Sequence, residues 1–378
     1  MNKNELNECI KKAEEGDVNS QLLLGLTYLN GDDEIPANDK EAFKWFKAAA
    51  EQGLAEAQFY LGACYLMGNG VKQDDNEAFR WFKAAAEQGD AKGQYNLGVC
   101  YLKGDGVKQD YYEAFRWFKA AAEQGFAYAQ NSLGHRYYLG QGVRQDYNEA
   151  FRWFKTAVEQ GLAEAQNNLG ICYLKGKGVR QDFNEAFRWF KAAAEQGYAE
   201  AQNHLGRCYY LGEGVKQDYK EAFLWYKAAA EQGNAYAQYF LGNCYYYGDG
   251  VEQDYNEAFR WYKAAAEQGD ADAQYRLGYC YYYGKGVKQD YYEAFRWYKA
   301  AAEQVDAEAQ YRLGDCYYYG DGVEQDFKEA YYWYLIAYRN GYTDAEQDVK
   351  SIENKLTYQQ KQEVQKRVNE WFNTHPKE

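Results

Sequence analysis

Few residues in this chain of 378 have the types and spacing that catalysis requires. Ser132 and His135 are three positions apart, so on a helix they share one face and could act as nucleophile and general base. A working triad also needs an acid that orients the base, and none is evident near them in the sequence. We therefore interpret the pair as ordinary surface residues and expect that the protein is not an enzyme.

Two other patterns suggest phosphate or nucleic-acid chemistry, and both are weak. The recurring loop with the pattern G-x-G-V, as in Gly104 to Val107, lacks the lysine and hydroxyl residue that end a phosphate-binding loop. Tyrosine runs such as Tyr281 to Tyr283 could stack on bases. However, Lys and Arg number 43 against 57 Asp and Glu, a net charge of −14, and the basic residues are scattered. This balance excludes a nucleic-acid partner and favours a protein or peptide of basic character.

The elements that position these residues follow from a strict repeat. Tryptophan recurs every 36 residues, at Trp45, Trp81, Trp117, Trp153, Trp189, Trp225, Trp261, Trp297 and Trp333. A period of this length indicates a small unit that buries its apolar face only against its neighbours. We expect these tryptophans to be buried between neighbouring units.

Residues 91–125 illustrate the unit. The spacing predicts a first helix from about Ala91 to Lys103, with Gly98 allowing a neighbouring helix to approach closely. Asp110 and Glu113 predict an N-cap with a reciprocal capping partner. A second helix follows to about Gln124, with alanines and aromatic residues on one face, and Gly125 ends it in a left-handed conformation.

The pattern AxAQxxLGxxYxxGxGVxQDxxEAxxWxxxAAEQG, which covers about residues 17–352, resembles the Sel-1-like repeats, relatives of the tetratricopeptide repeats. The resemblance implies an all-α, right-handed superhelical solenoid whose first helices line the concave side. It also implies a role as adaptor or scaffold, which in bacteria includes signalling, virulence and toxin immunity.

The organisation follows from this pattern. We expect an N-terminal capping helix at 1–16, nine repeats forming one solenoid at 17–341, and a partial repeat with a capping helix at 342–378. Val305 stands where the other copies have glycine. Because a β-branched residue is strongly disfavoured in the left-handed region, either the turn differs there or it is strained.

Seven of the eight cysteines occur once per repeat, and the copy with Arg136 lacks one. Equivalent helices of stacked repeats lie roughly 8–10 Å apart, which is beyond disulfide reach, so we expect reduced, semi-buried thiols. We expect Arg136 to extend towards solvent and Cys9, outside the repeats, to be exposed. His135 and His204 are two repeats apart, so we expect neither a metal nor another cofactor. Without an apolar signal-peptide run or a membrane-length segment, we expect no membrane partner and a cytoplasmic location, unless a leader has been removed.

The repeats also act as an internal alignment that separates invariant positions from variable ones. Positions two, five and nine residues after the first-helix glutamine vary and lie on one side of that helix. The position directly after this glutamine is asparagine in three consecutive copies. From these positions we predict a concave binding face made of Tyr60, Asn96, Asn131, His135, Asn167, Asn168, Asn203, His204, Arg207, Phe240, Asn243, Tyr247, Arg276, Tyr279, Tyr283, Arg312, Asp315 and Tyr319.

On this face the asparagines could grip a peptide backbone, while tyrosine and arginine anchor side chains. We therefore predict a non-enzymatic scaffold or adaptor for a protein or peptide, with immunity protein or virulence-associated adaptor as special cases. We expect a monomer or a weak homo-oligomer. The alternative is a hydrolase or a small-ligand-binding protein, similar to β-lactam-binding relatives, that uses the tyrosines and histidines.

Overall fold

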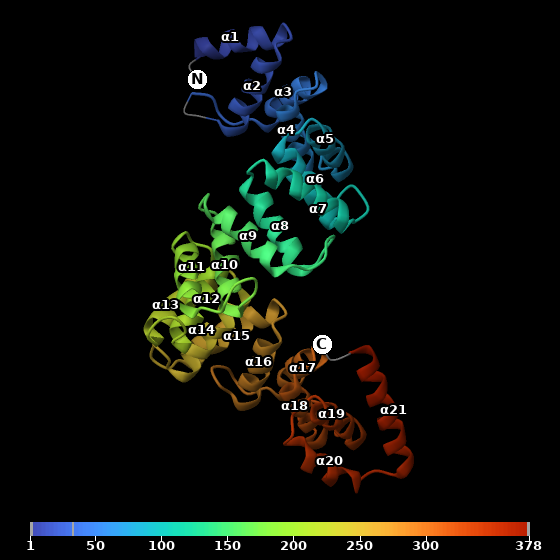
Figure 1. Ribbon diagram of the computed structural model, residues 1–378. Helices are drawn as coiled ribbons and strands as arrows, with labels where there is room; N and C mark the ends of the chain where they lie inside the picture. Colours follow the sequence, from blue (N-terminus) through green and yellow to red (C-terminus); the bar gives the residue numbers. More distant parts are fainter. Residues whose placement is uncertain (1–2, 32–33, 376–378) are drawn as a thin grey trace. The chain divides into compact units, whose positions relative to one another are not determined.

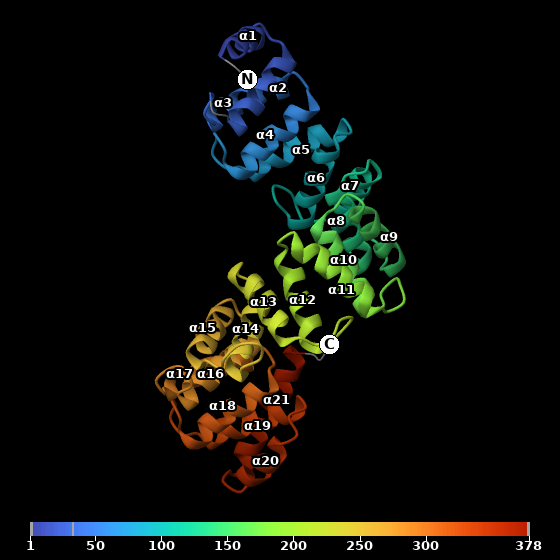
Figure 2. The same ribbon diagram turned by 90° about the vertical axis from the view of Figure 1, so that its left-hand side faces the viewer.

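The computed structural model describes residues 3–31 and 34–375, and these residues form helices and no strands (Figure 1). The chain divides into two compact units, unit 1 (Met1–Trp189) and unit 2 (Phe190–Glu378). Within each unit, consecutive helices pack as antiparallel neighbours in chain order, as both views show (Figure 2). This is the all-α solenoid of helix pairs that the period predicts.

Unit 1 begins with α1 (Lys3–Glu14) and continues with helix pairs. Its first helices are α2 (Val18–Asn30), α4 (Ala55–Met67), α6 (Ala91–Lys103), α8 (Ala127–Leu139) and α10 (Ala163–Lys175). Its second helices are α3 (Asp39–Glu51), α5 (Asp75–Glu87), α7 (Tyr111–Glu123) and α9 (Tyr147–Val158), and α11 (Phe183–Glu195) contains the division between the units.

Unit 2 continues the same alternation. Its first helices are α12 (Ala199–Leu211), α14 (Ala235–Tyr247), α16 (Ala271–Tyr283) and α18 (Ala307–Tyr319). Its second helices are α13 (Tyr219–Glu231), α15 (Tyr255–Glu267), α17 (Tyr291–Glu303) and α19 (Phe327–Arg339), followed by α20 (Ala345–Glu353) and α21 (Tyr358–Thr374).

The helix boundaries follow from local signals. Asp110 accepts hydrogen bonds from the backbone N–H groups of Tyr112 and Glu113, which caps α7. The predicted reciprocal bond is absent from this cap, because the Asp110 N–H donates to the Tyr101 carbonyl oxygen at 2.8 Å and the Glu113 carboxylate accepts from Arg116 at 2.7 Å. The second loop glycine has a role beyond the turn: a Cβ at Gly106 would lie 2.1 Å from the Asp75 carbonyl oxygen. The loop therefore rests on the preceding copy's second helix.

The core of each pair is built around the aromatic residue that follows the tryptophan. These nine residues, here called the central rings, are almost completely buried: Phe46, Phe82, Phe118, Phe154, Phe190, Tyr226, Tyr262, Tyr298 and Tyr334. The eight central rings other than Phe190 each pack directly on a first-helix glycine; a Cβ at Gly98 would lie 2.8 Å from the Phe118 ring. The close approach expected at Gly98 is thus confirmed, and the central ring is what approaches it.

The tryptophans are less buried than we expected. Trp45 and Trp333 are buried, whereas the seven between them are only partly covered. Trp81, for example, packs at the edge of the cluster that contains Phe46 on α3 and Leu61 on α4. The reason is geometric: the central ring faces into the helix pair, while the tryptophan beside it on the helix reaches only the margin of the preceding pair.

A buried glutamine joins each pair to the next. Gln94 on α6 donates to the carbonyl oxygen of Ala86 on α5 at 3.3 Å, and its own side-chain oxygen accepts from Gln124 at 2.8 Å. The amide is satisfied from two helices, so an apolar replacement would leave buried polar groups without partners.

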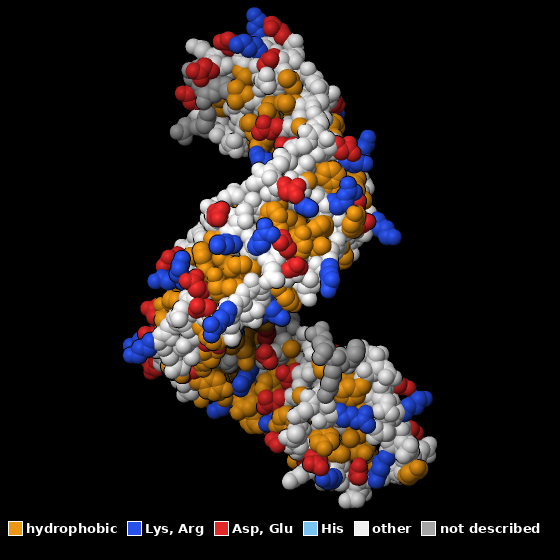
Figure 3. Space-filling view, in the orientation of Figure 1, with side chains coloured by type: hydrophobic (Ala, Val, Ile, Leu, Met, Phe, Trp, Pro, Cys, Tyr) orange, Lys and Arg blue, Asp and Glu red, His pale blue; other side chains and the backbone are white. Residues whose placement is uncertain are grey.

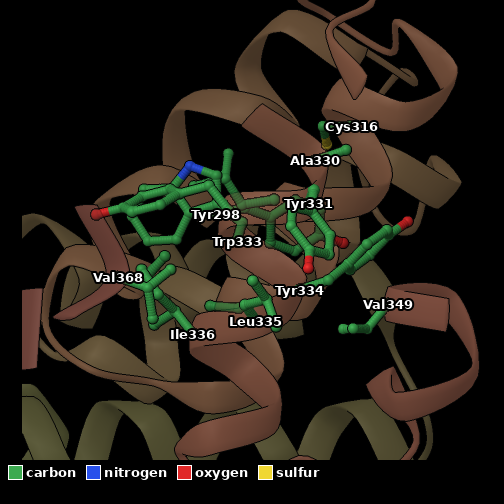
Figure 4. Packing of buried hydrophobic residues seen from close by; sticks show 14 of the residues in the cluster. Tyr298, Cys316, Ala330, Tyr331, Trp333, Tyr334, Leu335, Ile336, Val349 and Val368 are labelled. Atoms are coloured by element: carbon green, nitrogen blue, oxygen red, sulfur yellow. The ribbon is translucent and has the colours of Figure 1, made fainter. Parts of the chain in front are cut away.

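The C-terminal end of unit 2 has the largest core cluster (Figure 4). Ile336 and Leu335 on α19 pack near Val368 of α21, while Val349 of α20 lies beside Tyr334. Helices α20 and α21 thereby cover the apolar side that the last repeat would otherwise expose, as an end cap must.

The eight cysteines are free, as expected, but all of them are buried, so the expectations of semi-buried repeat thiols and an exposed Cys9 are wrong. The repeat cysteines lie at a first-helix position that faces the loop and the adjoining helix, and Cys9 packs in a cluster with Ala13, Leu24 and Trp45. The expectation that Arg136 extends towards solvent is also wrong. Arg136 is buried as well; its Nη1 donates to Gln141, while its Nε has no hydrogen-bond partner among the described residues. Its neighbours close over it before the guanidinium can reach solvent.

Val305 keeps the turn of the other copies. Its φ is 72°, the one positive value for a non-glycine residue in the described chain. Of the two expectations, an altered turn is therefore wrong, and strain in an unchanged turn is what the backbone conformation supports.

Candidate functional site

The predicted face divides between the two units. Unit 1 carries Tyr60, Asn96, Asn131, His135, Asn167 and Asn168, and unit 2 carries the other twelve residues of the predicted set. All stand on first helices, because each lies one to nine positions after the first-helix glutamine.

In unit 1, a polar chain connects α8 with α10. The Asn168 amide nitrogen lies 2.9 Å from the Asn131 side-chain oxygen and 2.9 Å from Nε2 of His135. Because the amide donates, Nε2 accepts, and the network assigns the imidazole proton to Nδ1. Burial, followed by the charge of Arg136, lowers the pKa of His135 to about 4. The imidazole is therefore neutral at physiological pH.

A pocket of about 310 Å³ lies beside this chain, and its walls come from three helices. It is lined by His135, Tyr138 and Leu139 of α8, Phe154 of α9, and Asn168, Ile171 and Lys175 of α10. The walls are mainly apolar, with the imidazole, one amide and one ammonium group as polar features. Such a pocket suits a ligand with an apolar body.

Ser132 and His135 do not form a nucleophile–base pair. The Nε2 atom of His135 accepts a hydrogen bond from Asn168 at 2.9 Å. The Ser132 hydroxyl hydrogen-bonds with the Tyr95 hydroxyl instead; burial raises the pKa of Tyr95, and this hydrogen bond partly offsets the rise. The geometry gives the serine no activating base.

Several predicted residues contribute to packing rather than to an open face. Tyr60, His204 and Phe240 stack on the central rings Phe46, Phe190 and Tyr226. Asn131 and Asn167 are buried, and Asn96 donates to the Lys92 carbonyl oxygen of its own helix at 2.9 Å. The expected ladder of asparagines is therefore not displayed at the surface. The side-chain oxygens of Asn167 and Asn203 are buried and lack hydrogen-bond partners among the described residues.

In unit 2, tyrosines form the most exposed part of the predicted face. Tyr247, Tyr283 and Tyr319 end successive first helices and are 51%, 45% and 64% exposed. The Arg276 guanidinium lies 5.9 Å from the Tyr247 ring centroid, and Tyr279 packs against Tyr283 at 4.4 Å. Within the described part of the chain, no carboxylate forms an ion pair with Arg276.

Four other charged and polar members of this face have side-chain partners. Arg312 donates to Asp315 at 3.2 Å, and the second oxygen of Asp315 accepts from the Tyr334 hydroxyl at 2.9 Å. Arg207 forms an ion pair with Glu213 at 3.4 Å, and Asn243 accepts from the Tyr262 hydroxyl at 2.7 Å. Arg276 differs from these arginines, because it hydrogen-bonds with Tyr239 and has no carboxylate ion-pair partner among the described residues.

The predicted set contained two of the seven pocket residues, His135 and Asn168. Leu139, Ile171 and Lys175 occupy the variable positions from which that set was drawn, whereas Tyr138 and Phe154 do not. A signal existed: Asn131 and Asn168 come from consecutive copies and occupy two positions that contact the same central ring. The signal appears only when positions are compared in pairs.

Within the described ranges, no cluster of histidine, cysteine and acidic residues could hold a metal ion, and no helix is long and apolar enough to cross a bilayer. Burial raises the pKa of Cys64 to about 11 and that of Cys172 to about 12, so these thiols are protonated. On the face in Figure 3, Lys and Arg are mixed with Asp and Glu and form no continuous basic patch.

Comparisons with known proteins agree with this architecture. The model of the Sel1 repeat matches nine consecutive segments: 18–54, 55–90, 91–126, 127–162, 163–198, 199–234, 235–270, 271–306 and 307–342. The chain is 35% identical to a Sel1 repeat protein from Oxalobacter formigenes, with 83% of this chain and 91% of the other covered and a TM-score of 0.61. It is 34% identical to a protective antigen of uropathogenic Escherichia coli, with 97% and 94% covered and a TM-score of 0.55.

A curated relative matches only locally. An F-box protein of Arabidopsis thaliana is 43% identical over 54 residues, and this match spans 14% of each chain. The likeness thus extends to little more than one repeat and says nothing of the remainder of that protein.

Proposed function

Because the chain belongs to the Sel1 repeat family, we propose that it is a non-enzymatic interaction scaffold that binds a protein or peptide on its first-helix face. The observation that carries the proposal is the tyrosine row of unit 2, Tyr247, Tyr283 and Tyr319, beside the Arg276 guanidinium. Tyrosine and arginine provide large contact areas, rigidity and hydrogen bonds, and they are enriched among residues that dominate binding energy.

The fold itself does not account for this row. The equivalent residues of other copies are Met67, Lys103 and Leu139, and the helices form equally well around them. Three aromatic side chains that remain largely in solvent gain little from folding. A partner that covers them would remove this apolar surface from water, and the favourable free energy of that burial would stabilise the complex.

The charges of this protein indicate which charges the partner should carry. The net charge of −14 favours approach of a basic protein. At the tyrosine row itself, Arg276 would receive an acidic group, because a half-buried guanidinium gains most from a carboxylate partner. A basic partner with one acidic contact residue satisfies both.

The finer role of virulence-associated adaptor is supported by one relative. The Escherichia coli protein that covers nearly the whole chain is a protective antigen. A role as immunity protein, a cytoplasmic location and a monomeric or weakly associating state remain predictions. The small-ligand alternative has the unit 1 pocket in its favour.

Affinity capture with quantitative mass spectrometry tests the proposal. The variant combines Tyr247→Ala, Tyr283→Ala and Tyr319→Ala, and the matched control changes Tyr112 and Tyr292, which are 61% and 62% exposed on second helices, to alanine. We expect the first variant to lose its specific partners by about tenfold or more and the control to retain them. Equal capture by wild type and the tyrosine variant would refute the proposed face.

A further inference from the structure

The exposed ends of the first helices in unit 1 alternate between apolar and basic side chains. Helices α4, α6, α8 and α10 end in four residues, here called the helix-end row: Met67, Lys103, Leu139 and Lys175. All four are exposed; Met67 is 71% exposed and Leu139 is 51% exposed. In unit 2 the equivalent positions are a leucine followed by three tyrosines. The two units therefore offer a partner different chemistry.

The two lysines of the helix-end row have no carboxylate partner among the described residues. By contrast, the second-helix lysines Lys83, Lys119 and Lys191 each form an ion pair with the glutamate four positions later, at 3.8, 3.8 and 3.9 Å. The ammonium groups of Lys103 and Lys175 can therefore pair with acidic groups from another molecule.

The pocket of about 310 Å³ adjoins the middle of this row. Leu139 and Lys175 both line it, together with the half-buried Ile171. Phe154 also lines it but is only 2% exposed. A ligand therefore reaches the aliphatic side chains of Leu139 and Ile171 and the apolar stem of Lys175. These walls suit one aliphatic side chain beside a negative charge.

The spacing of the row follows from the packing of its helices. Helices α6 and α8 meet where the ring centroids of Tyr95 and Tyr128 lie 6.3 Å apart. Helices α8 and α10 meet where Asn168 donates to Asn131 at 2.9 Å. Packed helices lie roughly 8–10 Å apart. A chain in the polyproline II conformation rises about 3.1 Å per residue with three residues per turn, so every third side chain points the same way, about 9 Å further on.

We propose that the helix-end row of unit 1 binds an extended segment of the partner in which an apolar residue stands three positions from an acidic residue on each side. This assignment rests on the proposed scaffold function. The apolar side chain enters the pocket beside Leu139 and Ile171, and the two carboxylates pair with Lys103 and Lys175. Charge complementarity then fixes the register of the segment on the row. Because the segment needs only two acidic residues, a partner that is basic overall can carry it.

Methyl NMR titration of the full chain with defined peptides tests the proposal. The probe is acetyl-Glu-Pro-Pro-Leu-Pro-Pro-Glu-amide, whose prolines favour polyproline II and whose symmetric order suits either chain direction. Three comparison peptides replace both glutamates by lysine, replace leucine by alanine, or keep only one proline on each side. We expect the probe to shift the methyl signals of Leu139 and Ile171 and to bind about tenfold more tightly than each comparison peptide. Equal binding of the glutamate and lysine peptides, or no shift at either methyl group, would overturn the proposal.

Charge reversal on the protein makes the test specific. The variant with Lys103→Glu and Lys175→Glu should bind the probe about tenfold more weakly and the lysine peptide more tightly than wild type does. The matched control combines Lys83→Glu and Lys119→Glu, which change the net charge equally on second helices, and it should bind the probe as wild type does. An equal loss in the control, or no gain for the lysine peptide in the first variant, would contradict the assignment.

The outcome is separable from that of the capture experiment. If the probe binds at the helix-end row and no partner is captured, the peptide site stands and the scaffold function fails. If partners are captured through the tyrosine row and the probe does not bind, the scaffold function stands and the acidic segment is wrong.

Discussion

The turn at Val305 allows the cost of a valine in the left-handed conformation to be measured, because the other copies have glycine at this position. Its backbone N–H donates to the Ala302 carbonyl oxygen at 3.1 Å, and the equivalent bond at Gly125 is 2.9 Å. The two turns are therefore alike, although one has a β-branched residue at φ 72°. The left-handed conformation costs an L-residue about 1–2 kcal/mol.

Little compensates for this cost. Val305 is 40% exposed, and a Cβ placed at the equivalent Gly269 meets no atom within 4 Å. Replacing valine by glycine removes this strain. It also makes the unfolded chain more flexible, which lowers the free energy of unfolding by roughly 0.5–1 kcal/mol and offsets part of the gain. We expect Val305→Gly to raise the free energy of unfolding by about 1 kcal/mol.

Urea unfolding followed by circular dichroism measures the effect. Hydrogen exchange of the amides between α17 and α18 supplies a local readout, because repeat arrays can depart from two-state unfolding. Val305→Asn should give a similar gain, since asparagine tolerates the left-handed region, and Val305→Ala should give little. The reciprocal Gly125→Val should destabilise by about the same amount. The reasoning fails if Val305→Gly is no more stable than wild type, or if Val305→Ala matches it.

Four further predictions follow from buried groups. Arg136→Cys, which restores the residue of the other copies, should stabilise the protein by about 1–3 kcal/mol in urea unfolding, because a buried Nε without a partner is removed; lower stability would contradict this. Gly98→Ala should destabilise by about 1–3 kcal/mol, since its Cβ would lie 2.8 Å from the Phe118 ring, and an unchanged midpoint would refute the packing. NMR titration of His135 should give a midpoint near pH 4, because burial lowers its pKa in the folded protein. This pKa lies below the unfolded value of about 6.5, so the contribution of His135 to the free energy of unfolding is complete above about pH 6.5 and declines as the pH falls towards 4. A midpoint near 6.5 would show an exposed ring. The repeat cysteines should resist iodoacetamide at pH 8 in the native protein and react after denaturation, because burial raises the pKa of Cys172 to about 12; rapid native labelling would show that they are accessible.

The fold was predictable in detail where local signals determine it. The predicted first helix at Ala91–Lys103 matches α6, and the second ends one residue earlier than predicted, at Glu123. Aspartate caps and glycine stops act within a few residues, so a single sequence contains them. Repetition then transfers one accurate assignment to every copy.

Burial was less predictable, because a helical wheel gives a direction and not the neighbour that lies there. The wheel placed Trp117 and Phe118 on the same face, yet only Phe118 is fully buried. It placed Arg136 at the border of the packed side, and the adjoining loop covers it. Such errors occur where a second element determines exposure, and that element's position is a property of the tertiary structure.

The candidate site was difficult to predict for a related reason. The columns of the internal alignment compare one position across copies, whereas a central ring is covered from two positions in two consecutive copies. Tyr60 and His204 looked like variable surface residues in their column, although each closes a core ring. Asn168 in the same column is hydrogen-bonded to Asn131 and His135, beside a Phe154 ring that is only 2% exposed. In a repeat array, a single variable position of an internal alignment therefore does not distinguish a residue that covers the core from one that binds a partner.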